Sequence, residues 1–325
     1  MKIFWENKSV LVTGADGFIG SWLTKALLQK RANVITIVRN KKLKSCLEIQ
    51  GIKDKVEIVY CDIKNMDVLK EKIKELNIDS CFHLAADSIV VDANKNPVPT
   101  FESNIIGTLN VLETCRLSGK VKRIIVASGD KVYGTQKQLP YTEDMPLLGV
   151  FPSDASKVCT EILANSYFKS FGLNICIVRS SNVYGGCDLN LSRIVPGTII
   201  SILKHEPPII RSDGTLERDY IYVEDLVHAY ITLAENMHRK EILGEAFNFG
   251  TQNPIRVIDL FNKITKLCGT SGKPKILGVA FNEINRQFLS IKKAKRLLNW
   301  EPKFSLEDGL KLTIKWYKEN LELFI

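Results

Sequence analysis

A strand that runs into a glycine-rich turn and then into a helix is the feature that most constrains this sequence. Residues 10–12 (Val-Leu-Val) form an unbroken apolar run, which is typical of a strand buried on both faces of a parallel sheet. Gly14, Gly17 and Gly20 follow, and apolar residues from Phe18 onward repeat with helical spacing. Because glycines carry no side chain, backbone N–H groups in such a turn can reach phosphate oxygens at the helix N-terminus. The stretch predicts a diphosphate-binding turn, with an ordinary glycine-rich connection as the alternative.

Apolar strands and amphipathic helices alternate through the first half of the chain. The further predicted strands are residues 33–38, 56–60, 80–84, 121–127 and 174–179, and the helices between them are 65–76, 104–117 and one that opens near residue 153. This alternation predicts an α/β fold with a Rossmann-type doubly wound parallel sheet.

We expect two interleaved domains. Residues 1–180 form the predicted dinucleotide-binding Rossmann domain, and residues 181–325 form a smaller C-terminal substrate domain. A helix at 224–236 and a strand at 246–249 are expected to return to the first sheet, and the other C-terminal helices are predicted at 191–204, 251–267, 292–298 and 306–316. The substrate domain is therefore not separated from the first domain by a linker.

Composition excludes several classes of partner. The chain has 325 residues, 45% apolar and 25% charged, as in ordinary globular proteins. No two of its eight cysteines are spaced C-x-x-C, so we expect reduced thiols and no metal. The net charge of +9 comes without interleaved aromatic residues, which argues against nucleic acid and favours a solvated surface. Because no apolar run reaches membrane-spanning length, we expect no membrane contact and a cytoplasmic location.

Three residues at predicted strand ends bear on the ligand. The second strand ends at Arg39 without a carboxylate, which favours NADP over NAD because an arginine accommodates a 2′-phosphate; the alternative is that Arg39 faces solvent. Asp62, after the third strand, either caps the next helix or binds the adenine amino group. His83 lies inside an apolar stretch, which favours a hydrogen-bonded core histidine over a catalytic one.

Polar residues gather after the predicted fifth strand. Ligands of doubly wound sheets bind beyond the carboxyl ends of the strands, and Asp130 lies beside Lys131 at such an end. A carboxylate next to an amine is a plausible proton-transfer pair. Lys157 lies on the following helix, where a lysine by itself would be read as a surface residue.

A series of motifs identifies a resemblance to a known family. In order they are Thr13-Gly14-x-x-Gly17-x-x-Gly20, Asp62-Ile63, His83-Leu84-Ala85-Ala86, Asn104-x-x-Gly107-Thr108, Val132-Tyr133-Gly134, Lys157, Arg179-x-x-Asn182-x-Tyr184-Gly185 and Arg218-Asp219-Tyr220. Together, from Lys8 to Pro302, they resemble the extended short-chain dehydrogenase/reductase family that acts on nucleotide sugars. Residues 192–198 and 210–215, with the Asp130-Lys131 pair, most resemble CDP-glucose 4,6-dehydratases among these epimerases and dehydratases.

The resemblance implies a nicotinamide dinucleotide, a nucleotide diphosphate hexose with CDP, GDP or UDP as carrier, and a homodimer formed by helices near 101–117 and 153–171. The implied cofactor-binding residues are Gly14, Asp16, Gly17, Phe18, Ile19, Gly20, Arg39, Asp62, Ile63, Leu84, Ala85, Ala86, Asn104, Ser128 and Lys157. The implied substrate-binding residues are Asp87, Asn182, Arg193, Ile194, Val195, Arg211 and Arg218. Among the arginines, Arg218 matches the family's diphosphate-binding residue, whereas Arg193, Arg211 and Arg286 are weaker candidates for which surface charge is the alternative.

Two central catalytic positions of the family differ in this sequence. The position of the catalytic tyrosine, four residues before Lys157, is Ser153, and the position of a serine or threonine before Asp130 is Gly129. An aliphatic hydroxyl is far less acidic than a phenol, so Ser153 cannot simply replace it. Three explanations are open: both residues were introduced to trap a substrate complex, the natural enzyme uses Asp130 and Lys131 instead, or the protein has lost catalysis.

The resemblance favours 4,6-dehydration to a 4-keto-6-deoxy sugar as the reaction. Hydride would pass from sugar C4 to the cofactor, Lys131 would take the C5 proton, and Asp130 would protonate the leaving 6-hydroxyl before the hydride returns to C6. Gly129, Ser153 and Lys157 complete the expected catalytic positions, and Ser128 and Asn182 would position the sugar. A 4-epimerase or reductase, and a non-catalytic nucleotide-sugar-binding protein, are the alternatives.

Overall fold

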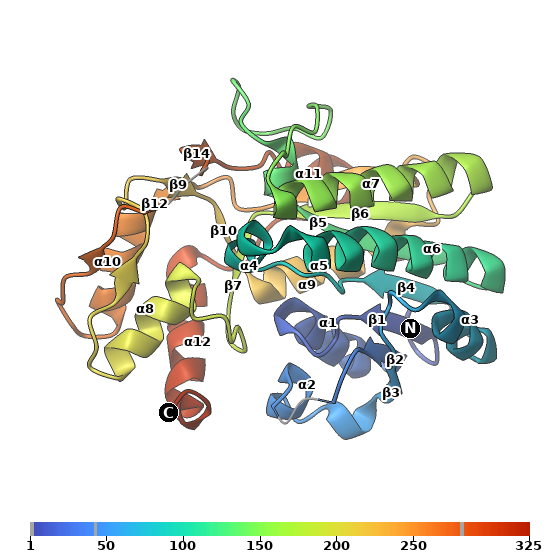
Figure 1. Ribbon diagram of the computed structural model, residues 1–325, viewed down its shortest axis with the longest axis horizontal. Coiled ribbons are helices and arrows are strands. Elements are labelled where there is room, and N and C mark those ends of the chain that lie inside the picture. The colour runs from blue at the N-terminus through green and yellow to red at the C-terminus, as the bar shows by residue number, and fades with distance from the viewer. Residues whose placement is uncertain (1–2, 42–43, 280–282) are drawn as a thin grey trace.

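A seven-stranded parallel sheet forms the centre of the computed structural model, which describes residues 3–41, 44–279 and 283–325 (Figure 1). Its strands are β1 (Ser9–Thr13), β2 (Asn33–Val38), β3 (Glu57–Tyr60), β4 (Ser80–His83), β5 (Arg123–Gly129), β6 (Ile175–Ser180) and β11 (Ala246–Phe249). They lie in the order β11-β6-β5-β4-β1-β2-β3, so the strand order reverses beside β1. This order confirms the predicted doubly wound sheet.

Helices lie on both faces of the large sheet and in the C-terminal part of the chain. They are α1 (Phe18–Gln29), α2 (Cys46–Ile49), α3 (Met66–Glu75), α4 (Val90–Lys95), α5 (Pro97–Phe101), a π-helical segment (Glu102–Ile106), α6 (Gly107–Ser118), α7 (Pro152–Phe171), α8 (Ile194–Leu203), α9 (Val223–Asn236), α10 (Val257–Leu267), α11 (Lys292–Leu298) and α12 (Leu306–Glu319). Short 3₁₀-helices are Lys53–Lys55, Asp130–Tyr133 and Leu321–Leu323. Apolar residues of α1 and α9 join one buried cluster and those of α3, α6 and α7 join another, so the sheet has a core on each side.

The remaining strands form three small sheets in the C-terminal part. β7 (Asn182–Tyr184) pairs with β10 (Tyr220–Tyr222), β8 (Ile209–Ile210) with β13 (Lys275–Ile276), and β9 (Glu217–Arg218) lies between β12 (Ile255–Arg256) and β14 (Arg286–Gln287). Figure 1 shows α8, α10 and α12 together on one side of the large sheet. In contrast, β11 pairs with β6 and α9 packs on α1, as the returning helix and strand were expected to do. The domain boundary near residue 180 stays a prediction.

Three predicted helices have other bounds for identifiable reasons. The predicted helix at 104–117 is part of a longer helical stretch made of α5, the π-helical segment and α6. This stretch starts at Pro97, because proline is well suited to the first helical turn. α8 begins only at Ile194, because Asp188 and Asn190 accept backbone N–H groups in the turn before it. α10 begins at Val257, because buried Asp219 accepts the N–H groups of Thr251 and Gln252 and holds them in a turn.

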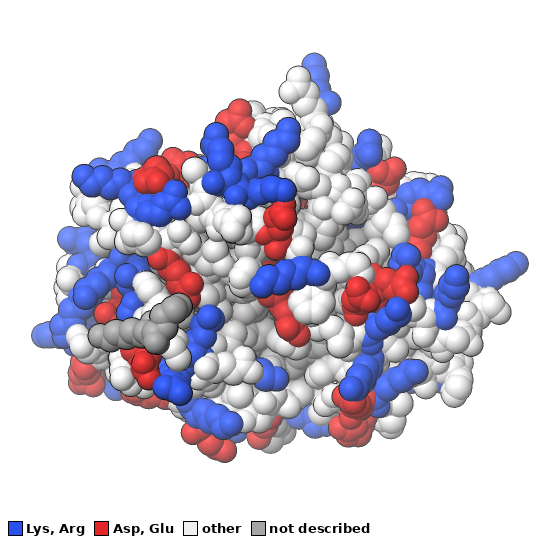
Figure 2. Space-filling view, turned by 180° about the vertical axis from the view of Figure 1, so that it is seen from behind, with Lys and Arg blue, Asp and Glu red and all other residues white. Residues whose placement is uncertain are grey.

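Charged side chains of both signs are dispersed over the surface. Figure 2 shows Lys and Arg side chains spread over the rear face with Asp and Glu side chains among them, as expected of solvated surface charge. None of the helices in the described ranges is long and apolar enough to cross a bilayer.

Candidate active site

The glycine turn forms a tight cradle between β1 and α1. Gly14 has φ of +75°, and a Cβ built there would lie 2.7 Å from the Ala85 backbone nitrogen. A Cβ at Gly20 would lie 2.2 Å from the Gly14 carbonyl oxygen. Gly17 precedes α1 with no side-chain cap, and the first turn of α1 holds no acidic residue. A side chain is therefore excluded at Gly14 and Gly20, and the turn leads into the N-terminus of α1, which fits the phosphates of a dinucleotide.

His83 is fully engaged below this cradle. Its Nδ1 lies 2.8 Å from Thr13 Oγ1, and its Nε2 lies 2.9 Å from Thr108 Oγ1. Thr108 donates to the Asn104 carbonyl, and Thr13 Oγ1 accepts from the Ala85 N–H, so a neutral ring with hydrogen on Nε2 satisfies every group. Burial, followed by the charge of Lys157, lowers the pKa of His83 to about 3. The prediction of a core histidine is confirmed.

Asn104 holds the turn that follows β4. Its Oδ1 accepts the Asp87 N–H at 2.7 Å, and its Nδ2 donates to the Asp87 carbonyl at 2.9 Å and to Ser156 Oγ at 2.8 Å. Leu84, Ala85 and Ala86 lie half-buried along this turn, beside the glycine cradle. The buried amide of Asn104 is thus committed to positioning the residues around it.

Arg39, Asp62 and Ile63 lie at the far end of the expected cofactor site. Arg39 is exposed directly after β2, and its charge acts on Lys64, whose pKa is raised by the hydrogen bond and ion pair to Glu102. Asp62 Oδ1 accepts the Lys64 N–H at 3.0 Å, whereas Asn65 caps α3. The helix-capping interpretation of Asp62 is therefore wrong. Ile63 is buried and leaves no room for a side chain at Gly107.

Asp130 and Lys131 follow β5 at the predicted edge of the sheet. Asp130 is only 5% exposed, and its Oδ2 has no hydrogen-bond partner in the described residues. Burial raises the pKa of Asp130 to about 7, although the charges of Lys131 and Arg218 oppose that rise. Gly129 just before it is extended, and a Cβ there would make an ordinary 3.7 Å contact with the Ser180 carbonyl, so a serine would fit.

The first turns of α7 bring Ser153 and Lys157 onto one face of the helix, four residues apart. Lys157 Nζ donates to the Ala127 carbonyl at 2.9 Å, which places the amine against β5. Burial lowers the pKa of Lys157 to about 8, opposed by the nearby Glu161 carboxylate. Ser153 is half-buried, and the adjacent Asp154, which sequence reasoning missed, is buried.

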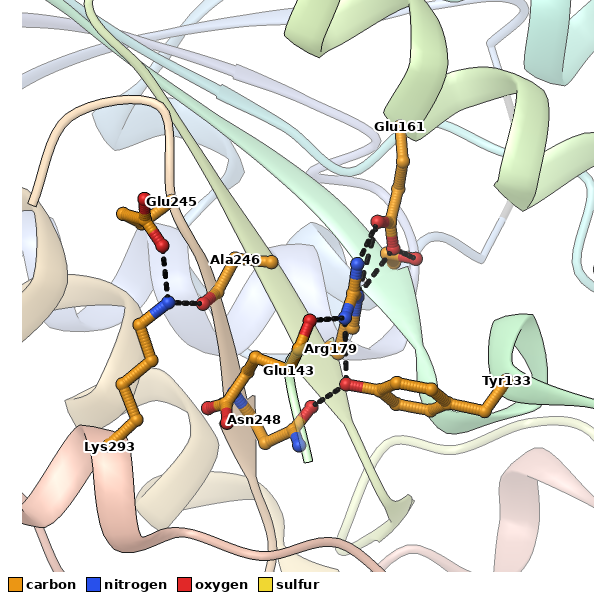
Figure 3. A network of polar contacts seen from close by, with 9 residues as sticks. Tyr133, Glu143, Glu161, Arg179, Glu245, Ala246, Asn248 and Lys293 are labelled. Carbon is orange, nitrogen blue, oxygen red and sulfur yellow. Dashed lines mark hydrogen bonds and ion pairs between the residues drawn. The ribbon is translucent and has the colours of Figure 1, made fainter. Parts of the chain in front are cut away.

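A buried network around Glu161 and Arg179 ties these elements together (Figure 3). Arg179 on β6 donates to both carboxylate oxygens of Glu161 on α7, at 2.6–3.1 Å. Ser128 donates to Glu161 Oε1 at 2.6 Å, and Arg179 donates to the Tyr133 hydroxyl at 2.7 Å. Tyr133 in turn donates to Asn248 on β11. Sequence reasoning missed Glu161, although its position four residues after Lys157 was a usable signal.

The predicted substrate residues come from several elements of the C-terminal part, and its arginines already hold protein partners. Arg218 is buried and pairs with Glu283 at 2.9 Å, and Arg193 pairs with Asp188 at 3.0 Å. The other contacts are Arg286 with Glu217, Arg211 with the Ser192 carbonyl, and Asn182 Nδ2 with the Asp219 carbonyl. Ile194 is half-buried, whereas Val195 lies in the apolar core and is used for packing. In the described ranges no group of three or more His, Cys, Asp or Glu side chains is placed to hold a metal.

Comparison with known proteins places this arrangement among nucleotide-sugar enzymes. A family model described as GDP-mannose 4,6 dehydratase matches residues 11–313. The chain is 32% identical to a trifunctional UDP-glucose 4,6-dehydratase/UDP-4-keto-6-deoxy-D-glucose 3,5-epimerase/UDP-4-keto-L-rhamnose-reductase of Arabidopsis thaliana; the match covers 98% of this chain but 48% of that protein, so the chain spans about half its length. It is 29% identical to the CDP-glucose 4,6-dehydratase of Salmonella typhimurium, over 98% and 92% of the two chains.

Solved structures show the same fold. A UDP-glucose 4-epimerase from Thermotoga maritima, determined with UDP-glucose, matches with a TM-score of 0.88 and 29% identity, over 96% of this chain and 99% of that one. A dTDP-glucose 4,6-dehydratase from Bacillus anthracis, in complex with NAD, matches with a TM-score of 0.86 and 28% identity, over 97% and 98%. The predicted fold class is confirmed.

The buried ion pair yields a stability prediction. Glu161→Gln should lower the free energy of unfolding by about 3–5 kcal/mol, because it leaves the Arg179 charge buried without its counterion. It should also lower the pKa of Lys157 further, since the Glu161 charge opposes the effect of burial. The matched control is Glu307→Gln, whose exposed pair with Lys311 should contribute no more than about 0.5 kcal/mol. Urea unfolding measures the free energy of unfolding of both variants. An equal loss of stability in the two would contradict the prediction.

Proposed function

Because the chain belongs to the GDP-mannose 4,6-dehydratase family, as its resemblance to extended short-chain dehydrogenases/reductases predicted, we propose that it is a nucleotide-sugar 4,6-dehydratase. Its substrate is a CDP-, GDP- or UDP-hexose, and its product is the 4-keto-6-deoxy sugar. The observation that carries this proposal is Asp130, a buried carboxyl with an unpartnered oxygen beside Lys131 at the carboxyl end of β5. Loss of a hydroxyl group needs such an acid, whereas epimerisation does not.

A nicotinamide dinucleotide fits the cradle at Gly14, Gly17 and Gly20, and when bound it supplies a reversible hydride acceptor. Ala85 and Ala86 border the same cradle, and Lys157 is placed to bind the nicotinamide ribose. We favour NADP, with NAD as the alternative. The support for NADP is the exposed Arg39 after β2, with the charge of Lys64 nearby. The related Bacillus anthracis structure holds NAD, which supports the alternative.

Asp130 and Lys131 each carry out one of the proton transfers. Asp130 gives its proton to the leaving 6-hydroxyl, and a pKa of about 7 keeps a large fraction of it protonated at neutral pH. Lys131 takes the C5 proton, which becomes acidic once C4 is a ketone. Ser128 and Asn182 position the sugar, and the diphosphate binds arginines such as Arg218 by replacing their present protein partners.

Two other functions have specific support. A 4-epimerase is favoured by the likeness to the Thermotoga maritima structure. A non-catalytic nucleotide-sugar-binding protein is favoured by Ser153 and Gly129, since neither supplies a phenol or a hydroxyl bond to the substrate at the family's positions. If Ser153 and Gly129 were introduced to trap a substrate complex, the protein would likewise bind a nucleotide sugar without converting it.

Mass spectrometry of a panel of nucleotide hexoses tests the reaction. The protein should remove one water from its substrate, and in deuterated water it should place deuterium at C5. Lys131→Met should abolish both signals because the C5 base is lost, whereas the exposed Lys137→Met should leave both unchanged. Unchanged hexose mass with inverted C4 would indicate an epimerase, and unchanged sugar with tight binding would indicate the binding protein.

The cofactor preference is tested by Arg39→Asp. NADP binding should weaken by about 1–3 kcal/mol, because a charge-assisted contact to the 2′-phosphate is replaced by repulsion. NAD binding should be unchanged or tighter. Lys55→Asp, an equal charge change at the opposite end of the neighbouring β3, is the control. Calorimetric titration measures both cofactors, and NADP affinity equal in the Arg39 and Lys55 variants would make Arg39 a surface residue only.

The proposed homodimer rests on large apolar side chains that are exposed on α5, the π-helical segment, α6 and α7. They are Val98, Ile106, Leu117, Ile162 and Phe171. A second copy that packs its α6 and α7 on the same elements buries them in a four-helix contact. Ile162→Lys should therefore yield a monomer by light scattering at micromolar concentration, and Leu312→Lys, at an exposed leucine of α12, should not. A monomeric wild-type protein would contradict the dimer.

A further inference from the structure

Asp154 is a buried carboxyl close to the proposed proton-transfer pair. It is 8% exposed and follows Ser153 in the first turn of α7. A Cβ built at Gly149 would lie 3.0 Å from the Asp154 Cβ and 3.0 Å from the Lys131 carbonyl oxygen. Gly149 thus fills the space between the two residues with backbone alone, which lets α7 approach the turn that carries Asp130 and Lys131. In the described part of the chain the Asp154 carboxyl accepts no hydrogen bond and caps no helix N–H.

The proposed reaction needs a proton acceptor, and Ser153, His83 and Lys157 do not supply it. When C4 of the sugar loses hydride, the proton of its hydroxyl must go to a base. The Ser153 hydroxyl is too weakly acidic to relay that proton as a phenol would. His83 is held neutral between two threonines, and its low pKa makes it a poor base. Lys157 donates to the Ala127 carbonyl, and with a pKa of about 8 it is mostly protonated at neutral pH and cannot accept the proton.

We propose that Asp154 is a catalytic residue whose carboxylate takes the proton of the sugar 4-hydroxyl as the hydride leaves C4. The assignment rests on the proposed 4,6-dehydration. It places the acceptor one residue after Ser153, on the turn of α7 that faces Lys131.

The assignment balances the protons of the whole reaction. Asp154 gains the O4 proton while the C4 hydride electrons pass to the cofactor. Lys131 takes the C5 proton and returns it to C5, where the double bond is reduced as the hydride is delivered to C6. Asp130 loses one proton to the departing hydroxyl, which leaves as water. One proton gained by Asp154 equals one proton lost by Asp130, so a transfer between the two carboxyls resets the site.

The surroundings of Asp130 and Asp154 favour the protonation states that the scheme needs of these two carboxyls. Lys131 takes the C5 proton as a neutral amine, so it must first lose its own proton. Burial raises the pKa of Asp154 to about 6, with Lys131 opposing and Glu283 reinforcing the rise. The pKa of Asp130 rises to about 7, with Lys131 and Arg218 opposing burial and with Asp219 and Asp154 reinforcing it. Burial therefore leaves both carboxyls able to change protonation state near neutral pH, so that Asp154 can accept a proton and Asp130 can donate one.

The kinetic test uses the cofactor-loaded protein and the Asp154→Asn variant. Its kcat for water loss should fall 10²–10⁴-fold with KM nearly unchanged, because a proton acceptor is lost and no binding contact is. The variant should still exchange the C5 proton of the isolated 4-keto-6-deoxy product with deuterated water, because that step belongs to Lys131. Asp67→Asn, at an exposed residue of α3, should match the wild type in both assays.

A stability measurement supplies a readout that does not depend on turnover. A folded-state pKa above the unfolded value means that ionised Asp154 destabilises the fold, and that this cost disappears as pH falls through the folded pKa. Asp154→Asn should therefore melt at a higher temperature than the wild type at pH 8, and the two should converge as the pH falls from about 6 to 4. A carboxylate that only stabilises the helix N-terminus would give the opposite order at pH 8.

The outcomes of these experiments distinguish the role of Asp154 from the proposed dehydratase activity. Wild-type protein that removes no water from any hexose overturns the proposed function and the role of Asp154 with it. Active wild-type protein with an equally active Asp154→Asn variant overturns only the role of Asp154. The same holds if the variant melts lower at pH 8 or loses C5 exchange along with turnover, because either result indicates a structural role.

Discussion

The buried ion pair of Glu161 and Arg179 is the interaction on which the site depends. Desolvating a carboxylate and a guanidinium is costly, and the cost is offset only because both are surrounded by hydrogen bonds. Ser128 and Tyr133 supply these bonds from either side of the catalytic turn after β5. The pair thereby joins β5, α7, β6 and, through Asn248, β11. The relative position of Lys157 and Asp130 follows from that junction.

Asp130 and Asp154 have different surroundings from Glu161. Glu161 accepts hydrogen bonds from Arg179 on both carboxylate oxygens and from Ser128 on Oε1. Asp130 and Asp154 are buried with lysine and arginine charges nearby but without a comparable set of donors, so burial dominates and raises the pKa of each. Carboxyls with pKa values shifted in this way are enriched at functional sites. The fold thus separates acids that hold the site together from acids available for proton transfer.

Sequence reasoning named the candidate site residues whose chemistry is visible locally. The glycine turn, Asp130-Lys131 and Lys157 each follow a predicted strand or open a predicted helix, and parallel strands bring such ends to one edge of the sheet. The sequence was less informative about two other residues. The Asn104 side chain accepts the Asp87 N–H and holds that turn, and the Asp62 carboxylate accepts the Lys64 N–H and does not cap α3. Glu161 and Asp154 were missed, because an acidic residue on a helix looks solvent-exposed until its neighbours are known.

The sequence by itself determined the order of the main strands and helices, the glycine turn and the family, because periodicity and glycine spacing act over a few residues. Only the tertiary structure decided which charges are buried and which are paired. Arg218 meets Glu283 across 65 positions of the chain, and Arg179 meets Glu161 across 18. Desolvation and Coulomb energy depend on distances and burial that exist only after the chain has packed. The protonation states on which the chemistry depends were therefore set by the fold.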